Sequence, residues 1–267
     1  MKKLISDRIR TFVREFQTRE YIQTEFGEPL VGFADAFSPE IQGLRQVIGE
    51  NHVLPQQVLS DAKAVLAYYV PFTEKLAETN REEGAASPEW ARAYEELNML
   101  FAELNPELVE YIRSLGGEAA IPTAAMEFDQ QELVSNWSHR HMAYAAGLGT
   151  FGINNMLITR KGCCGRFNSI VTNLELDFDK PMQEEMCLYK ANGSCSVCVS
   201  NCPAEALKPD DSDKFRAGFA RAKCYEVCLE NADRYPIPED LAPSYSEAGS
   251  EVCGKCVTGS PCAFWKK

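Results

Sequence analysis

The chain has no long apolar run, no recognisable export signal and few basic residues. No apolar stretch in its 267 residues approaches the roughly 20 that are needed to cross a membrane. The opening Met1-Lys-Lys-Leu leads directly into charged, helical sequence instead of the apolar segment of a signal peptide. These two absences predict a cytoplasmic protein with no membrane partner.

Basic residues are outnumbered, with 27 Lys and Arg against 39 Asp and Glu, and the formal net charge is −12. A strongly acidic surface repels the phosphate backbone of nucleic acids, so direct nucleic-acid binding is not expected. The net charge does not exclude a local basic patch that binds RNA.

Cysteine, in contrast, is abundant and concentrated in one region. Nine of the 11 cysteines lie between Cys187 and Cys262. From Cys195 the chain reads C-x-x-C-x-x-x-C-P, and a second C-x-x-C begins at Cys253. This spacing is typical of a protein that holds two 4Fe–4S clusters, each bound by four thiolates. In two-cluster ferredoxins the cysteine before the proline binds the other cluster, so we expect the two motifs to be cross-wired.

Two other chemistries use clustered cysteines. Paired C-x-x-C motifs bind zinc, but the cysteines present exceed what one tetrahedral zinc site needs. Disulfides are the other alternative, and they belong to oxidising compartments, which the missing export signal argues against. Iron–sulfur clusters are therefore the favoured interpretation.

Helical and strand patterns alternate along the first two thirds of the chain, which predicts a layered α/β (α+β) domain. A composition shift places the expected boundary between a domain over 1–179 and a cysteine-rich domain over 180–267. The second holds few apolar side chains, so metal clusters are expected to stabilise it. The expected elements are helices over 4–22, 87–104, 106–115 and 130–146, and strands over 64–70, 118–122, 155–159 and 167–176.

A glycine motif follows the helix expected over 130–146. Gly147, Gly149 and Gly152 have the G-x-G-x-x-G spacing of dinucleotide sites. That fingerprint needs a strand before it and a helix after it, and here the order is reversed. The glycines are more consistent with a tight turn that lets backbone or ligand approach closely. With Asn155 they form the candidate cofactor-binding set.

Polar residues just before this motif are candidates for chemistry. His139 or Arg140 is expected either to contact an anionic ligand or, for the histidine, to donate a proton. The alternative, polar groups that cap a helix or face solvent, is equally consistent with the sequence. Cys163 and Cys164 are adjacent and cannot easily bind one cluster together, so we expect two packed or partly exposed thiols there.

The run over 138–159, with 168–176 and the cysteine module, resembles the epoxyqueuosine reductases and, more distantly, the reductive dehalogenases. The resemblance covers roughly residues 60–262. It implies a nitroreductase-like domain that carries cobalamin, beside a ferredoxin-like domain with two 4Fe–4S clusters that pass electrons to the cobalt. The reductases remove the epoxide oxygen of a modified tRNA base. No Asp-x-His-x-x-Gly corrinoid motif is present, but the family binds cobalamin without one.

The chain departs from the family pattern in its cysteines. Asn192 stands where the first motif has its first cysteine, and Cys187 is the expected substitute. Residues are inserted before Cys262, and the helical repeat domain of many relatives is missing. Cys224 matches an isolated family ligand, which leaves Cys228 unligated, although the sequence does not decide between Cys187 and Cys228 as the eighth ligand. The expected ligands are Cys187, Cys195, Cys198 and Cys262 for one cluster and Cys202, Cys224, Cys253 and Cys256 for the other.

A second departure concerns the proton donor. The resemblance implies an aspartate before the glycine motif, and counting back from Gly147 places Leu133 there. On a helix Asp129 lies on roughly the same face, displaced by about 5.4 Å. Asp129 is thus a catalytic candidate, but true epoxyqueuosine reductase activity is not expected.

Together these features predict an iron–sulfur oxidoreductase whose substrate is unknown. Its partner would be an electron-donor protein or a small-molecule reductant, and cobalamin is a candidate cofactor. The alternative is a ferredoxin-like electron-transfer protein without substrate chemistry of its own, and a structural zinc protein is a third interpretation.

Overall fold

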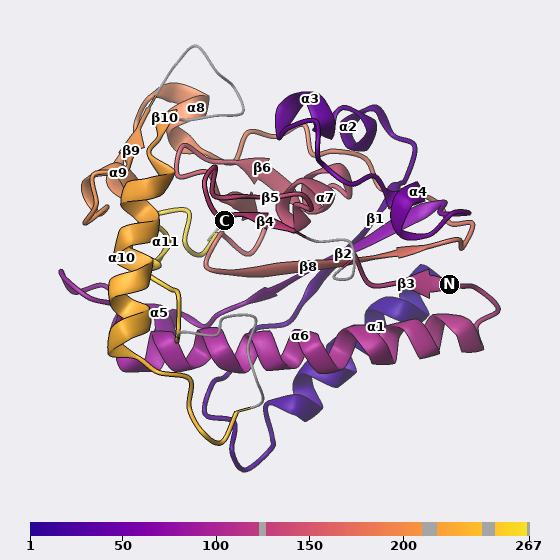
Figure 1. Ribbon diagram of the computed structural model, residues 1–267, viewed down its shortest axis with the longest axis horizontal. Coiled ribbons are helices and arrows are strands. Elements are labelled where there is room, and N and C mark those ends of the chain that lie inside the picture. Colours follow the sequence, from indigo (N-terminus) through magenta and orange to yellow (C-terminus); the bar gives the residue numbers. More distant parts are fainter. Residues whose placement is uncertain (123–126, 210–217, 242–248, 266–267) are drawn as a thin grey trace.

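The computed structural model describes residues 1–122, 127–209, 218–241 and 249–265 (Figure 1). Its centre is a four-stranded antiparallel sheet in the order β1-β2-β8-β3. These strands are β1 (Leu30–Asp35), β2 (Ala64–Pro71), β3 (Ala119–Ala120) and β8 (Gly165–Thr172). Every residue of β2 is buried, which explains why its sequence is an unbroken apolar run.

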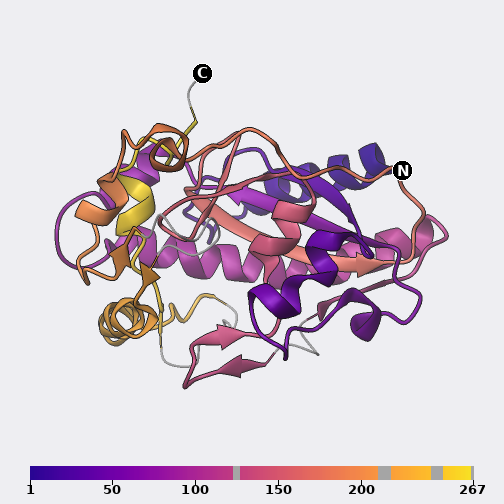
Figure 2. The same ribbon diagram turned by 90° about the horizontal axis from the view of Figure 1, so that it is seen from above.

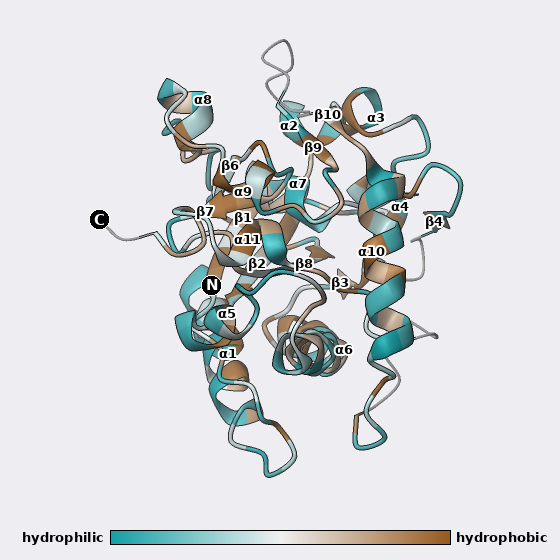
Figure 3. Cartoon of the chain, turned by 90° about the vertical axis from the view of Figure 1, so that its left-hand side faces the viewer, coloured by the Kyte–Doolittle hydropathy of each residue, from teal (hydrophilic) through white to brown (hydrophobic). Residues whose placement is uncertain are grey.

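Helices cover both faces of the sheet (Figures 1 and 2). On one face lie α1 (Lys2–Phe16) and α6 (Pro88–Ser114). On the other lie α2 (Pro39–Gln42), α3 (Leu44–Val47), α4 (Pro55–Val58) and α7 (His139–Ala145). Seen from the side, α6 points end-on toward the viewer beneath the sheet (Figure 3). The result is a mixed α/β architecture, as the sequence predicted in outline.

Helix α6 is one continuous element, so the prediction of two helices that meet at Pro106 was wrong. A proline inside a helix frees the carbonyl of the residue four positions earlier. Here that residue is Ala102, and both Ala102 and Pro106 are exposed, so water can satisfy the freed carbonyl. The buried face continues unbroken through Leu104 and Leu108.

The helix expected over 130–146 was also wrong in its first half. Residues before α7 form a hairpin of β4 (Phe128–Asp129) and β5 (Val134–Ser135). The Asp129 carboxylate accepts hydrogen bonds from the backbone N–H groups of Gln131 and Glu132, at 2.8 and 2.9 Å. Aspartate competes in this way with helix formation, and Leu133 then takes a left-handed φ of 53°.

Residues after β8 return to the sheet and then form the cysteine-rich part. Asp179 fixes the segment that leads into this part. Its carboxylate accepts a hydrogen bond from the backbone N–H of Phe33 and forms an ion pair with Lys2. The later elements are α8 (Leu188–Asn192), α9 (Val197–Ser200), β9 (Leu207–Lys208), β10 (Gly218–Phe219), α10 (Arg221–Arg234) and α11 (Lys255–Thr258). One hydrophobic core runs from α1 to Ala263 and includes the side chains of both parts. Among the described helices, none is long and apolar enough to cross a membrane.

Candidate iron–sulfur site

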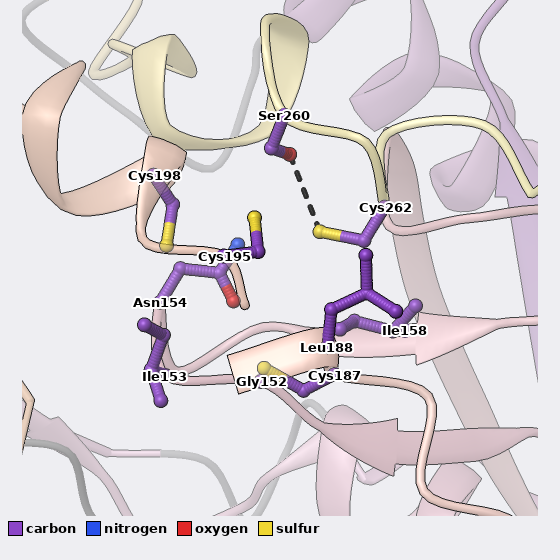
Figure 4. Close-up of a pocket in the computed structure, with 10 residues that line it drawn as sticks. All are labelled: Gly152, Ile153, Asn154, Ile158, Cys187, Leu188, Cys195, Cys198, Ser260 and Cys262. Atoms are coloured by element: carbon purple, nitrogen blue, oxygen red, sulfur yellow. Dashed lines mark hydrogen bonds between the residues drawn. The ribbon is translucent and has the colours of Figure 1, made fainter. Parts of the chain in front are cut away.

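Four cysteines predicted to share a cluster line one cavity (Figure 4). The empty volume there is about 300 Å³, part of it open to solvent. We call Cys187, Cys195, Cys198 and Cys262 the first cysteine group. The rest of the lining is apolar or uncharged and consists of Gly152, Ile153, Asn154, Ile158, Leu188 and Ser260.

Cys187 is placed by contacts to the strand pair that contains the glycine motif. This pair is β6 (Gly149–Phe151) and β7 (Leu157–Thr159). The Glu185 carboxylate accepts from the backbone N–H of Cys187 at 2.8 Å and from the Thr150 hydroxyl at 3.2 Å. Asn192, at the family's first cysteine position, is exposed and accepts from the backbone of Ser194 at 3.0 Å. The structure therefore brings Cys187, and not Asn192, to the cavity.

Cys262 reaches the same cavity from the end of the chain. Its carbonyl accepts from the backbone N–H of Cys163 at 2.9 Å, which joins the C-terminal segment to the turn before β8. The Cys262 sulfur lies 3.2 Å from the Ser260 hydroxyl and 3.8 Å from the Cys163 sulfur. Hydrogen bonding from the Cys163 thiol is the main cause that lowers the pKa of Cys262 to about 7, and Ser260 adds to it. Burial raises the pKa of Cys198 to about 12.

The other predicted ligands gather around α10 and α11. We call Cys202, Cys224, Cys253 and Cys256 the second cysteine group. Burial is the largest cause that raises the pKa of the half-buried Cys256. The charges of Cys253 and Cys224, then of Cys198 from the first group, and then of Cys202 raise it further. Cys228 lies one helical turn from Cys224, and their thiols hydrogen-bond, which lowers the pKa of Cys224 to about 7 and raises that of Cys228. Cys228 thus lies beside the second group without belonging to the predicted set.

The turn that carries Cys253 and Cys256 is held by a network of buried hydrogen bonds. The Asn80 amide, fully buried, donates to the Cys253 carbonyl at 2.8 Å. The Lys255 ammonium, 6% exposed, donates to the carbonyl and side-chain oxygens of Asn80, both at 3.2 Å, and to the Glu82 carbonyl at 2.7 Å. Burial lowers the pKa of Lys255, whereas the charge of Cys253 raises it. A loop between α5 (Glu74–Thr79) and α6 thereby fixes two expected ligands.

Neither group has the close spacing of a single-ion site. Within the described ranges, no three Cys, His, Asp or Glu side chains converge tightly enough to hold one metal ion. Zinc, about 2.3 Å from each sulfur, needs such a tight set. In a four-iron cluster each thiolate binds a different iron, so the sulfurs stand farther apart. The identity of the metal that these cysteines bind therefore stays a prediction.

Arg140 links α7 to the second cysteine group. Its Nη1 donates to the Asn155 carbonyl at 2.6 Å and to the Met156 sulfur at 3.3 Å. Burial lowers the pKa of Arg140, and the thiolate charges of Cys256 and Cys224 act in the opposite direction. Among the described residues no carboxylate lies within ion-pair distance of this guanidinium. The remaining N–H groups of the half-buried Arg140 guanidinium are therefore suited to bind an anionic ligand or one rich in carbonyl groups.

His139 lies on the other side of α7, against the sheet. Its Nδ1 is 2.8 Å from the Ser169 hydroxyl, which also accepts from the Trp137 indole at 3.1 Å. Burial, followed by the nearby charge of Arg166, lowers the pKa of His139 to about 3. The imidazole is therefore neutral near pH 7, which argues against the imidazolium as a proton donor. His141 instead pairs with Ser138 at the start of the helix, at 2.7 Å.

The glycine motif, expected to contact a cofactor, packs mostly against other parts of the chain. Gly147 ends α7 with φ +72°, and a side chain there would collide with the Lys180 carbonyl. A side chain at Gly149 would collide with the Ile158 carbonyl across the strand pair. Gly152 lines the cavity of the first cysteine group. Asn155, with φ 61°, presents its carbonyl to Arg140. Close backbone packing thus accounts for two glycines, while the cofactor role of the set stays a prediction.

Asp129, the remaining catalytic candidate, lies in the β4–β5 hairpin. It is exposed, and its Oδ1 accepts the two backbone hydrogen bonds described above. The hairpin leans toward α10, since the Phe128 and Tyr225 ring centroids are 6.3 Å apart. Because residues 130–137 are not helical, the helical offset that separated Asp129 from the expected donor position was wrong.

Sequence reasoning missed three residues around the cysteines. Ser260 contacts the Cys262 sulfur, and Lys255 and Asn80 anchor the second motif. Lys255 could have been suspected, because it stands between two expected ligands. Nothing near Asn80 in the sequence indicates a contact with Cys253. Cys163 and Cys164 are both fully buried, so of the two expected states, packed or partly exposed, the structure shows the packed one.

Comparisons with known proteins agree with the resemblance predicted from the sequence. No protein-family model matches the chain. An epoxyqueuosine reductase of Lactococcus garvieae is 28% identical over 169 residues, which are 60% of this chain and 43% of that protein. A tetrachloroethene reductive dehalogenase of Dehalobacter restrictus is 39% identical over 120 residues, 43% of this chain and 20% of that protein.

Solved structures give the same two names. A crystal structure of selenomethionine-labelled epoxyqueuosine reductase matches with a TM-score of 0.58 and 16% identity, over 98% of this chain and 66% of that one. A catabolic reductive dehalogenase matches with a TM-score of 0.53 over 81% of this chain. At this identity the structural likeness shows the fold alone. The prediction of relatives is confirmed, and the chain matches less than half the length of these curated relatives.

Proposed function

We propose that this protein is an iron–sulfur oxidoreductase that passes electrons through two 4Fe–4S clusters to a cofactor or substrate bound by its N-terminal part. The observation that carries the proposal is the placement of the eight predicted ligands. Four line one cavity. Of the four others, Cys202 follows α9, Cys224 lies in α10, and Cys253 and Cys256 lie at α11, and the charges of the first three act on Cys256. The names of the relatives support an oxidoreductase of this group.

The first cluster would be held by the first cysteine group, with Ser260 as a hydrogen-bond donor to the Cys262 sulfur. The second would be held by the second cysteine group, with its loop fixed by Asn80 and Lys255. Asn154 lies between them, because it lines the first cavity and donates to the Cys256 carbonyl at 3.4 Å. This contact supports a short path between the two clusters.

Cobalamin is the cofactor that the resemblance implies, and the residues beside the second group are compatible with it. Arg140 offers guanidinium N–H groups to carbonyl or phosphate oxygens, from a half-buried place without a competing carboxylate. Bound cobalamin would supply a cobalt centre that accepts electrons and attacks or reduces the substrate. The chain's own part is to bind this group and to exclude water around it.

The substrate remains a matter of proposal. The resemblance implies an aspartate as proton donor, and this chain has Leu133 at the counted position, so we propose a substrate other than epoxyqueuosine. Asp129, on the exposed hairpin, is the nearest aspartate. Conversion of epoxyqueuosine in tRNA by the reduced, cobalamin-supplied protein, abolished in Asp129→Ala, would overturn this part of the proposal.

The second candidate function is an electron carrier without substrate chemistry. It is favoured by the glycine motif, because the chain's own backbone packs against Gly147 and Gly149 where a cofactor was expected. Anaerobic purification with iron and cobalamin supplied distinguishes the two. Stoichiometric corrin, weakened by Arg140→Gln, supports the enzyme, whereas clusters without corrin support the carrier.

A further inference from the structure

Buried or half-buried cations lie close to the second cysteine group, whereas none is among the described residues that line the cavity of the first. Arg221, half-buried at the start of α10, is a further cation close to Arg140. Lys255 stands within the second motif, and Arg140 approaches from α7. The cavity lining of the first group contains no lysine or arginine. This asymmetry is a property of the polypeptide and does not depend on which substrate the protein reduces.

The Lys255 cage fits a charged ammonium. An ammonium has three N–H donors and no acceptor. The three acceptors around it are the two Asn80 oxygens and the Glu82 carbonyl, all of them uncharged. Within the described residues no carboxylate lies within 4.0 Å of this nitrogen, although the exposed Glu82 side chain acts on it from farther away. A buried cation without an adjacent anion is costly unless some other negative group compensates it.

The nearest negative group is the second cysteine group itself. Cys253 and Cys256 flank Lys255 in the chain, and the charge of Cys253 acts directly on the ammonium. The charges of Cys256 and Cys224 likewise act on Arg140. A cluster bound by these half-buried thiolates would therefore lie close to both positive charges.

Charge near a cluster changes its reduction potential because reduction adds one negative charge. A nearby cation stabilises the reduced state more than the oxidised state, and low solvent exposure strengthens the effect. We propose that Lys255 and Arg140 hold the second cluster at a higher reduction potential than the first, so that an electron delivered to the first cluster moves to the second, beside α7. This inference rests on the proposed two-cluster function.

The test is a potentiometric titration of the full chain with both clusters in place, followed by electron paramagnetic resonance. We expect Lys255→Gln, which keeps donors but removes the charge, to shift the higher of the two midpoint potentials to a more negative value. The lower potential should stay where it is. Lys75→Gln is the matched control, because Lys75 is exposed on the neighbouring helix α5. It should move neither potential.

Arg140→Gln provides an independent second variant and should shift the same cluster in the same direction. An unchanged higher potential in a Lys255→Gln protein that keeps its clusters would overturn the inference, as would a shift of the lower potential. Loss of the clusters in both variants would also overturn it, because the two cations would then be needed for folding and not for setting the reduction potential. Failure of the wild type to hold two clusters would instead overturn the proposed function.

Discussion

Asn80 joins the N-terminal part of the chain to the loop of the second cysteine group, so its removal should loosen that loop. Its amide donates to the Cys253 carbonyl, and its side-chain oxygen accepts from the backbone of Ser87 and from Lys255, at 2.9 and 3.2 Å. Asn80→Ala deletes all three interactions inside a fully buried site.

The expected cost follows from the groups left unpaired. A buried polar group without a partner costs about 1–3 kcal/mol, and Asn80→Ala strands the Cys253 carbonyl and the Ser87 N–H. Lys255 keeps two of its three acceptors. We therefore expect the loop to open with about 3 kcal/mol less free energy, which corresponds to an opening equilibrium increased on the order of a hundredfold.

A chelator-driven bleaching experiment under anaerobic conditions measures this opening. In Asn80→Ala, we expect about half of the visible cluster absorbance to disappear on the order of a hundredfold faster, while the other half keeps the wild-type rate. Thr79→Ala is the control, since Thr79 is exposed and its hydroxyl bonds within its own helix and to Ser87. Bleaching of both halves at the wild-type rate would refute the role given to Asn80.

Three further predictions concern the ligands, the pH dependence and the folding of the cysteine-rich part. Cys187→Ser should lose about half of the bound iron while Cys228→Ser keeps it, and the reverse result in iron analysis would exchange their roles. Burial lowers the pKa of His52 from 6.5 to about 4, so the unfolded chain binds more protons between these values and stability should fall as the pH drops through this range. The loss should reach about 1.4 kcal/mol at one pH unit below 6.5, and urea unfolding of His52→Leu should lack that contribution. Cluster removal should expose residues 187–262 to limited proteolysis before residues 1–179, because unligated thiolates leave the loops unanchored; equal resistance of both would contradict this.

Local chemistry was sufficient to predict several elements of the fold. The apolar face of α1, including Ile5, Ile9 and Phe16, is buried as its helical spacing predicted, although the helix ends at Phe16 and not near 22. Strand β2 lies within one residue of its expected bounds.

The errors arose where a side chain or a distant contact overrides local preference. Residues 130–133 favour a helix by composition, but the Asp129 side chain binds the backbone N–H groups that a helix would need. Gly149 lies in a strand because it pairs with Thr159, and single-residue propensity contains no information about that partner. Contacts of this kind are not visible in local sequence.

The candidate site shows the same division. Cysteine spacing alone grouped Cys195 and Cys198, and the resemblance added Cys187 and Cys262, which the structure brings to one cavity. The polar groups that support them come from far along the chain, as the separation of Asn80 from Cys253 shows. Such supports depend on how the whole chain folds back on itself.

The central claim, two four-iron clusters in one chain, is tested most directly by iron and acid-labile sulfide analysis of anaerobically purified, reconstituted protein. The account predicts about eight irons and about eight sulfides per chain. Stoichiometric zinc, or no more than about four irons with all eight predicted ligands intact, would contradict it.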